Sequence, residues 1–238
     1  MILLIDADSL IFASCYKPKD KITDSIYYKR IDKCKEKFDG QLINIVTTLE
    51  EQYDIKEVRL FSGRSKNNFR KLLSKEYKAN RSGEKPPMLD RMHQYVKEHY
   101  EAIQSCGHET DDAVAKYWYE IQKVVGRDNV MIVSIDKDYM QFPALIYNYH
   151  PKHKKVYDIT EEQAMYNFYE QMIIGDTADN VNYFKGLGKA FAKKYLEGCN
   201  SKYKYTKKLY ELFKMRYKQK AKLRYIECYN LLKLRTDV

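Results

Sequence analysis

The sequence predicts an α/β protein: a twisted parallel β-sheet with helices on both faces, followed by a helical region. Two observations lead to this class. Up to Asp158, short apolar runs recur with helical stretches between them, which is typical of a parallel sheet covered by helices. After Asp158 the strand signals stop and the patterns are helical. We therefore expect a core over residues 1–158 and a helical region over residues 159–238.

Four apolar runs in the first part of the chain have the length and composition of strands. They are Met1–Ile5, Val58–Phe61, Val130–Ile135 and Leu145–Tyr149. Two further stretches, Gln41–Gln52 and Asp111–Val125, carry apolar residues at helical spacing and are expected to cover the sheet.

A polar stretch separates the second strand from the third. Ser82–Pro87 contains a glycine and two prolines among charges, which predicts a loop. Met88–Ser105 then predicts a polar helix outside the core pattern. An insertion over about residues 82–105 that leaves the sheet and returns is a candidate lid or arch.

The end of the chain is basic and rich in tyrosine. From Lys202 onward it holds twelve Lys or Arg against three acids. One interpretation is an amphipathic helical pair whose tyrosines cover the core and whose lysines are solvated. The other is a surface on which nucleic-acid bases stack.

Composition points to a polyanionic partner. The 238 residues carry a formal net charge of +10, so nucleic acid is the first partner to consider. The five cysteines include no C-x-x-C pair, which argues against a zinc ribbon or a disulfide framework and fits a reducing cytoplasm. The opening apolar run ends at Asp6, too short for a spanning helix, and has no basic leader of a signal peptide.

The strongest feature is the position of the acids relative to the apolar runs. Each acid alone is typical of a helix cap, but four groups of them fall at strand ends or helix starts. One acid closes the first strand, two stand at the end of the strand over residues 130–135, and three stand just ahead of the apolar helical run that starts at Ala113. Two more stand in the sequence GDTADN. The eight are Asp6, Glu109, Asp111, Asp112, Asp136, Asp138, Asp176 and Asp179.

The strand-end acids should meet at the carboxyl edge of the sheet, where open α/β sheets bind ligands. Eight carboxylates at one edge would repel one another unless cations lay between them. Oxygen ligands alone suit Mg²⁺ or Mn²⁺ better than zinc. Two such ions can activate a water and stabilise a leaving oxygen in phosphodiester hydrolysis.

These motifs resemble the flap endonuclease and phage 5′-exonuclease family. The matching pieces, in order, are LLIDADSLIF, FRKLLSKEYKANR, ETDDAVA, SIDKDYMQF and GDTADNVNYFKGLGKAFAKKYL, and the similarity extends to about Leu234. The resemblance implies a PIN-like 5′-nuclease core with a helical arch, and a C-terminal region containing a helix-hairpin-helix.

The resemblance also implies roles for single residues. One metal site would draw on Asp6, Glu109, Asp111 and Asp112, and the second on Asp136, Asp138, Asp176 and Asp179. Lys78 and Arg81 match a lysine and an arginine that face the scissile phosphate, where a cation stabilises transition-state charge. Tyr77 is a candidate to stack on a terminal base, or is a packing tyrosine. Asp8 is interpreted as a ligand through water or as a helix cap, and is left outside the site.

A glycine-containing turn follows the last acids. Gly186, Gly188 and Lys189 resemble the hairpin of a helix-hairpin-helix, in which backbone N–H groups approach a phosphate closely. By resemblance, this hairpin grips the duplex backbone without reading sequence and is often accompanied by a monovalent cation such as K⁺.

The chain departs from the family pattern in two places. The family commonly has an aspartate at the end of the second strand, where this chain has Ser62 and Gly63. The Pro-Gly that precedes the hairpin in the family is here Asn182 and Tyr183. The first departure removes one acid from the first metal site.

The resulting expectation is a monomeric, cytoplasmic, phage-type 5′-nuclease in replication or repair. It would use two Mg²⁺ ions, with Mn²⁺ as a substitute, to cut DNA at 5′ ends, flaps and nicks, and RNA primers in RNA–DNA hybrids. Two alternatives remain open from the residues. One is a PIN-like ribonuclease, and the other is a branched-DNA-binding protein in which the lost acid has weakened catalysis.

Overall fold

The computed structural model describes residues 1–15, 30–63, 68–81, 83 and 85–237. The part up to Asp158 alternates strands and helices. In chain order its elements are β1 (Ile2–Asp6), α1 (Asp8–Ser14), α2 (Ile31–Glu50), β2 (Glu57–Gly63), α3 (Phe69–Leu73), α4 (Leu89–His99), β3 (Ile103–Ser105), α5 (Thr110–Val125), η2 (Arg127–Asn129), β4 (Val130–Val133), η3 (Lys137–Gln141), β5 (Leu145–Asn148) and β6 (Lys155–Asp158).

The strands form one six-stranded sheet in the order β3-β2-β1-β4-β5-β6. All neighbours are parallel except β5 and β6, which form an antiparallel edge. Asp6 lies opposite Phe61 of β2, and Ile5 lies opposite Val133 of β4. The carboxyl ends of these three central strands therefore meet at one edge of the sheet.

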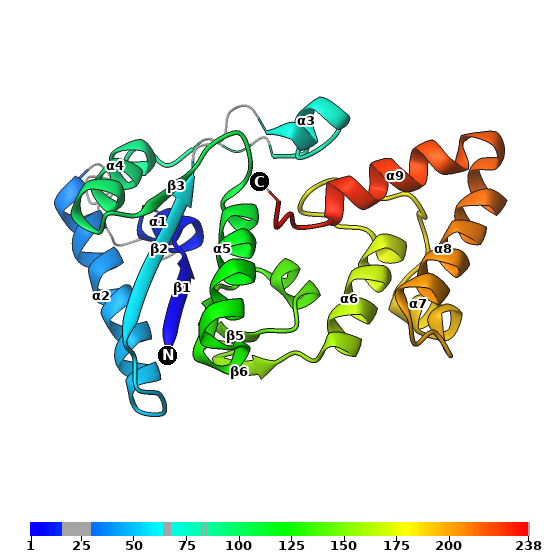
Figure 1. Cartoon of the computed structure of the whole chain (residues 1–238). Helices are drawn as coiled ribbons and strands as arrows, with labels where there is room; N and C mark the ends of the chain where they lie inside the picture. The colour runs from blue at the N-terminus through cyan, green and yellow to red at the C-terminus, as the bar shows by residue number, and fades with distance from the viewer. Residues whose placement is uncertain (16–29, 64–67, 82, 84, 238) are drawn as a thin grey trace.

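The two faces of the sheet bury alternate residues of β1, as the period of two in a strand requires. Leu3 and Ile5 pack into a cluster with α1, α2 and α4. Leu4 faces the other side and packs with α5, represented by Val114 and Trp118. Figure 1 shows α2 and α4 on one side of the strands and α5 on the other. The predicted class, a mostly parallel sheet with helices on both faces, is confirmed.

The rest of the chain is helical. It consists of α6 (Glu161–Ile174), α7 (Lys189–Leu196), α8 (Lys202–Tyr217), η4 (Lys218–Lys220) and α9 (Ala221–Leu232). These helices share a cluster of their own, in which Tyr205 is buried and Tyr210, Tyr225 and Tyr229 are partly buried. The tyrosines thus mainly cover a core, as the first of the two interpretations holds, although Tyr203 is exposed.

The four predicted strands are confirmed as β1, β2, β4 and β5, with ends shifted by one or two residues. Two short strands at the edges, β3 and β6, were not predicted. The predicted helix Gln41–Gln52 is the second half of α2, which begins ten residues earlier at Ile31.

The predicted helix over Met88–Ser105 is confirmed for Leu89–His99, but its extension to Ser105 and its place outside the core are wrong. The segment divides into α4 and the strand β3, and α4 packs on α1, α2 and β2. Met92 and Val96 are fully buried in the first cluster because they lie one helical turn apart on the inner face of α4. Of the predicted arch over residues 82–105, positions 82 and 84 lie outside the described residues, and the remainder offers no free-standing helix.

Candidate active site

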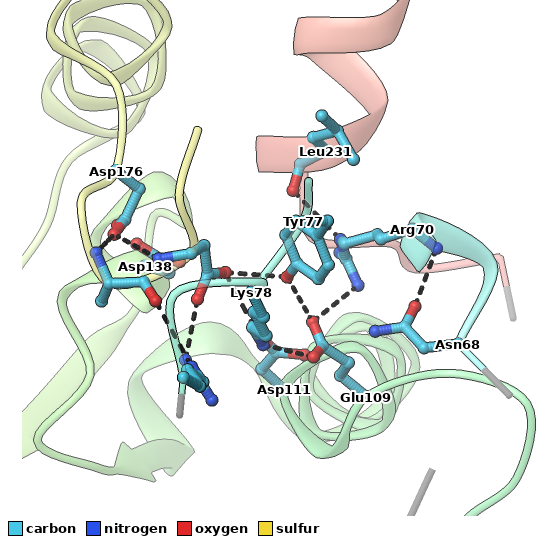
Figure 2. Close-up of polar contacts among 12 residues, drawn as sticks. Asn68, Arg70, Tyr77, Lys78, Glu109, Asp111, Asp138, Asp176 and Leu231 are labelled. Atoms are coloured by element: carbon cyan, nitrogen blue, oxygen red, sulfur yellow. Dashed lines mark hydrogen bonds and ion pairs between the residues drawn. The ribbon is translucent and has the colours of Figure 1, made fainter. Parts of the chain in front are cut away.

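The predicted acids gather where the carboxyl edge of the sheet meets the helical region. Asp6 ends β1, and Asp136 caps η3 just beyond β4, with Asp138 in the first turn of η3. Glu109 caps α5, and Asp111 lies in its first turn. Asp176 and Asp179 lie in the loop after α6. Figure 2 shows acids from the core and from this loop facing one another across Tyr77 and Lys78.

Asp112 has a structural role. Arg70 Nη1 donates to its Oδ2 at 2.6 Å, and Arg70 Nη2 to its Oδ1 at 2.8 Å. The backbone N–H groups of Arg235 and Glu109 donate to the same two oxygens at 2.9 and 3.4 Å. An ionised carboxylate accepts about four hydrogen bonds, so this one is saturated. We therefore exclude Asp112 from the ligands that the sequence suggested.

Arg70, which the sequence analysis did not single out, joins distant parts of the chain. Its side chain is 1% exposed. Besides Asp112, it donates to the carbonyl oxygens of Leu231 at 3.1 Å and Lys233 at 3.0 Å. It also contacts Glu109 at 3.3 Å (Figure 2). The end of α9 is thereby fixed to the start of α5, beside the acids.

Tyr77 bridges the two acid groups. Its hydroxyl lies 2.7 Å from Oε2 of Glu109 and 2.7 Å from Oδ2 of Asp179. The residue is only 3% exposed and packs with the helical cluster. Of the two interpretations of Tyr77, the packing tyrosine agrees with the structure and stacking on a DNA base does not, because the ring is enclosed by protein.

The loops 76–81 and 176–181 are joined by reciprocal hydrogen bonds, which we call the clasp, and they place Lys78 among the acids. Asn80 Nδ2 donates to the carbonyl oxygen of Thr177, and Asn180 Nδ2 donates to that of Glu76, both at 2.8 Å. The N–H of Lys78 donates to the carbonyl oxygen of Asp179 at 2.8 Å. Both Lys78 and Asn180 have φ of 57°, in the left-handed region that favours glycine. The motifs EYKANR and GDTADN are thus two halves of one structure.

Gly175 allows the second loop to close. Its φ is 77°, and a Cβ at this position would collide with the carbonyl oxygen of Val181. The N–H of Asp176 donates to that oxygen at 2.7 Å, and the N–H of Val181 donates back to Asp176 at 2.8 Å. This close approach fixes Asp176 and Asp179 on one small turn.

The two predicted basic residues lie among these acids. Lys78 forms an ion pair with Glu109, and its Nζ lies 3.6 Å from Oδ2 of Asp179. Arg81 Nη2 donates to Oδ1 of Asp179 at 2.8 Å, and its side chain is 57% exposed. A third cation, Lys137, was missed by the sequence analysis, and its Nζ lies 3.0 Å from Oδ2 of Asp176. Its only sequence signal is its place between Asp136 and Asp138.

Four acids have cations within about 3.3 Å, and we call them the cation-paired acids: Glu109, Asp112, Asp176 and Asp179. Burial alone would raise the pKa of Glu109, but Lys78 outweighs burial and lowers it. Burial likewise opposes the effect of Lys137 on Asp176, whose net pKa is lowered. Each of the four cation-paired acids thus has a Lys or Arg of the protein itself as its partner.

Five other acids have raised pKa values, and we call them the raised-pKa acids: Asp6, Asp8, Asp111, Asp136 and Asp138. Burial and then the charge of Asp8 raise the pKa of Asp6 to about 7. Burial and then Asp136 raise the pKa of Asp138 to about 8. Among the described residues, no Lys or Arg nitrogen lies within 4 Å of these five carboxylates. Their excess negative charge is what a bound cation would relieve.

Within the described part of the chain, no three His, Cys, Asp or Glu side chains already stand close enough together to hold a metal ion. The donor set nevertheless fits a hard cation, because it consists of carboxylates whose repulsion is uncompensated. Lys78 and Lys137 already bind acids that a metal would share. Metal binding therefore has to compete with these ion pairs.

The predicted hairpin lies on the surface after the GDTADN loop. Gly186 has φ of 91°, and Gly188 caps α7, whose first residue is Lys189. All three residues are exposed. Tyr183, at the departure from the family pattern, packs its ring on Phe213. The exposed glycines and the N-terminus of α7 are free of side-chain bulk on the solvent side, as contact with a phosphate requires.

The molecule combines a parallel sheet, an acidic edge and a basic loop between core and helices. This combination is typical of α/β nucleases that bind divalent metal ions through carboxylates. The model of the "5′-3′ exonuclease, N-terminal resolvase-like domain" matches residues 1–170. The chain therefore belongs to the 5′-3′ exonuclease family.

A curated 5′-3′ exonuclease of Buchnera aphidicola subsp. Schizaphis graminum is 29% identical over 110 residues. The match covers 43% of this chain and 36% of the relative, so the chain spans about a third of the length of this relative.

Solved structures share the fold. The bacteriophage T5 protein co-crystallised with metal ions is 18% identical, with a TM-score of 0.65, and the match covers 99% of this chain and 90% of that one. The T5 flap endonuclease in complex with DNA and metal ions is 18% identical, with a TM-score of 0.61, covering 99% and 89%. The catalytic core of Rad2 with DNA substrate is 14% identical, with a TM-score of 0.51, covering 98% and 74%.

Across the described residues, none of the helices combines the length and the apolar character needed to cross a bilayer.

Proposed function

We propose that the chain is a structure-specific 5′-nuclease that hydrolyses phosphodiester bonds of DNA at 5′ ends, flaps and nicks with divalent metal ions. The observation that carries the proposal is the clasp between the loops 76–81 and 176–181. It holds Lys78 and Arg81 among carboxylates that come from both parts of the chain. Acids for metal ions and cations for a phosphate are thus assembled at one place.

Each group has a distinct chemical task. Asp6, Glu109, Asp111, Asp136, Asp138, Asp176 and Asp179 are the residues that would hold Mg²⁺, with Mn²⁺ as a substitute. Two such ions supply an activated water and stabilise the leaving oxygen. Lys78 and Arg81 bind the scissile phosphate and stabilise the charge that develops on it. The T5 proteins of the same fold that were crystallised with metal ions and with DNA support this assignment.

The hairpin of Gly186, Gly188 and Lys189 is proposed to hold the duplex by its backbone, with a K⁺ ion in the turn. Its exposed position at the start of α7 supports this role. Because the contact is to phosphate, binding should weaken with salt and show little sequence preference.

We extend the proposal to RNA–DNA hybrids as substrates and to a monomeric, cytoplasmic enzyme of replication or repair. All five cysteines are free, which fits a reducing compartment. The most exposed large apolar side chains, Leu72, Val124 and Tyr203, lie on three different helices. Their places on three different helices favour a monomer over a chain with one large apolar interface.

The test is cleavage of a 5′-labelled flap on a nicked duplex, in Mg²⁺ or in EDTA. The native chain should release short 5′ products only with metal, and the variant with Asp136→Asn and Asp138→Asn should release none. Asp128→Asn, an exposed acid on η2, is the matched control and should cleave normally.

Two other outcomes would change the assignment. Binding of the flap without cleavage in Mg²⁺ and in Mn²⁺ would favour a branched-DNA-binding protein. Cleavage of single-stranded RNA in preference to the DNA flap would favour a PIN-like ribonuclease.

A further inference from the structure

The end of β2 has no acid and no room for one. Ser62 is fully buried, and its Oγ accepts a hydrogen bond from Gln104 Nε2 at 2.8 Å. A Cβ at Gly63 would collide with the side chain of Ser105 and lie 2.6 Å from Oγ1 of Thr110. Any carboxylate that serves this corner of the site must therefore come from another element.

Asp8 supplies a carboxylate at this corner from the start of α1. Its Oδ1 accepts from the N–H of Gly63 at 3.1 Å. Its Oδ2 accepts from Oγ1 of Thr110, the first residue of α5, at 2.7 Å. The side chain thus lies over the end of β2 and beside the helix start that carries Glu109 and Asp111.

Capping of α1 does not explain this orientation. Asp8 is the first residue of α1, its N-cap is Ala7, and no side-chain cap hydrogen bond is present at this helix start. At this helix start, the N–H of Asp8 instead donates a hydrogen bond to Oδ1 of Asp6 at 3.2 Å. The Asp8 carboxylate is therefore directed away from its own helix and toward the acid cluster.

The Asp8 carboxylate is also accessible and incompletely bonded. Its side chain is 36% exposed, and each oxygen accepts one hydrogen bond out of about two. The charge of Asp8 raises the pKa of Asp6 and is the largest cause of this shift after burial. The groups facing it are Asp6, Glu109, Lys78 and His93, whose Nδ1 lies 3.9 Å from Oδ1.

We propose that Asp8 belongs to the divalent-metal site and provides, from the start of α1, the carboxylate that the end of β2 lacks. The inference rests on the proposed metal-dependent nuclease function. It assigns to Asp8 a ligand position, direct or through one water, next to Asp6. The loss of an acid at Ser62 then leaves the number of charges at the site unchanged.

The test measures metal binding directly. Mn²⁺ binding is followed by electron paramagnetic resonance of the free ion, with and without the nicked flap, for the native chain and for Asp8→Asn. The amide keeps an acceptor for Gly63 but loses the charge. We expect affinity for one ion to fall 10- to 100-fold, as for other ligand-shell changes. Asp39→Asn, whose carboxylate accepts from Tyr95 and Tyr100 far along α2, should bind Mn²⁺ like the native chain.

A second readout separates metal binding from folding. In cleavage assays, the Mg²⁺ concentration for half-maximal rate should rise for Asp8→Asn, while the rate at saturating Mg²⁺ largely recovers. The melting temperature in EDTA should not fall, because a crowded charge has been removed. Asp8→Ser repeats both measurements in case the amide disturbs folding.

The outcomes distinguish the two proposals. Native Mn²⁺ affinity in Asp8→Asn, with a lower melting temperature, would overturn the inference and leave Asp8 a purely structural link. Absence of Mn²⁺ binding by the native chain, with and without DNA, would overturn the proposed function together with the inference.

Discussion

The cation-paired acids and the raised-pKa acids share one site, yet their charge is balanced in opposite ways. Glu109, Asp176 and Asp179 are neutralised by Lys78, Lys137 and Arg81. Asp6, Asp136 and Asp138 have no such partner, and their pKa values are raised first by burial and then by the charge of neighbouring acids. Lys and Arg side chains stabilise the cation-paired acids before any metal ion binds. The crowding of the raised-pKa acids instead lowers the stability of the metal-free chain.

This difference separates the acids that stabilise the fold from the acids that a metal ion would bind. The cation-paired acids link α3, α5 and the loop after α6, so they hold the two parts of the chain together. The raised-pKa acids accept hydrogen bonds from neutral groups, but no Lys or Arg of the described residues forms an ion pair with them, so a bound cation would relieve their crowding. The following changes should separate the two roles, beginning with the largest effect.

Replacing Arg70, a partner of the cation-paired acids, should lower the stability of the fold more than the other changes. Arg70→Ala leaves the fully buried Asp112 without its main partner and frees the end of α9. Breaking a buried ion pair from one side costs about 3–5 kcal/mol, so the free energy of unfolding in urea should fall by that amount.

Arg81→Ala is the control for this change, because the Arg81 side chain is 57% exposed and the loss of its ion pair with Asp179 should cost at most about 1 kcal/mol. Equal losses for the two variants would show that Arg70 does not carry the link between core and helices.

Replacing Lys78 should spare the fold but damage the chemistry. Lys78→Ala removes the cation nearest Glu109 and, by our proposal, the partner of the scissile phosphate. Loss of one such electrostatic group typically costs about 10²–10³ in rate, and single-turnover cleavage of the flap would measure it. Lys75→Ala, an exposed lysine three residues earlier, should cleave at the native rate. A small effect of Lys78→Ala on the rate, with weaker DNA binding alone, would reduce Lys78 to an anchoring residue.

The raised-pKa acids should make the metal-free chain less stable as pH rises. Asp8, Asp6 and Asp138 have folded pKa values of about 6, 7 and 8, above the ordinary aspartate value of 3.8. Between about pH 4 and pH 8 the folded state therefore holds protons that the unfolded state has lost. The stabilisation is complete below that window and disappears as pH rises through the folded pKa values.

Melting in EDTA at pH 5, 6.5 and 8.5 would measure this loss, at about 2–4 °C for each kcal/mol. Asp138→Asn should flatten the decline and Asp39→Asn should not. Mg²⁺ should stabilise the chain most at pH 8.5, because the ligands must be deprotonated. A melting temperature that rose with pH in EDTA would contradict the raised pKa values.

Most of the raised-pKa acids could be predicted from the sequence, because their place depends on where nearby strands and helices begin or end. Asp6 and Asp136 follow directly from where apolar strands end, and parallel strands bring their ends to one edge. The family motifs added Asp176 and Asp179, but their position against Lys78 depends on the clasp between loops about 100 residues apart.

The cation-paired side was less predictable because its contacts are long-range. Arg70 meets Asp112 across 42 residues and Leu231 across 161, and no local pattern marks such pairs. The burial of Tyr77 has the same origin. The position of α4 did have a signal, since Met92 and Val96 repeat at helical spacing, but the surrounding charges obscured it.

The smallest expected effect comes from loosening the clasp. Asn180→Gly keeps the left-handed backbone but removes the hydrogen bond to Glu76, worth about 0.5–1.5 kcal/mol, so the melting temperature should fall by a few degrees. Asn200→Gly, in the exposed loop before α8, is the control for the added glycine. Cleavage should slow less than tenfold and Mn²⁺ affinity should hold, because the raised-pKa acids lie in or next to β1, α1, α5 and η3 rather than on the two bonded loops. A larger loss of Mn²⁺ affinity than of stability would mean that the two sides of the site are not independent, since a change on the cation-paired side would then have reached the ions.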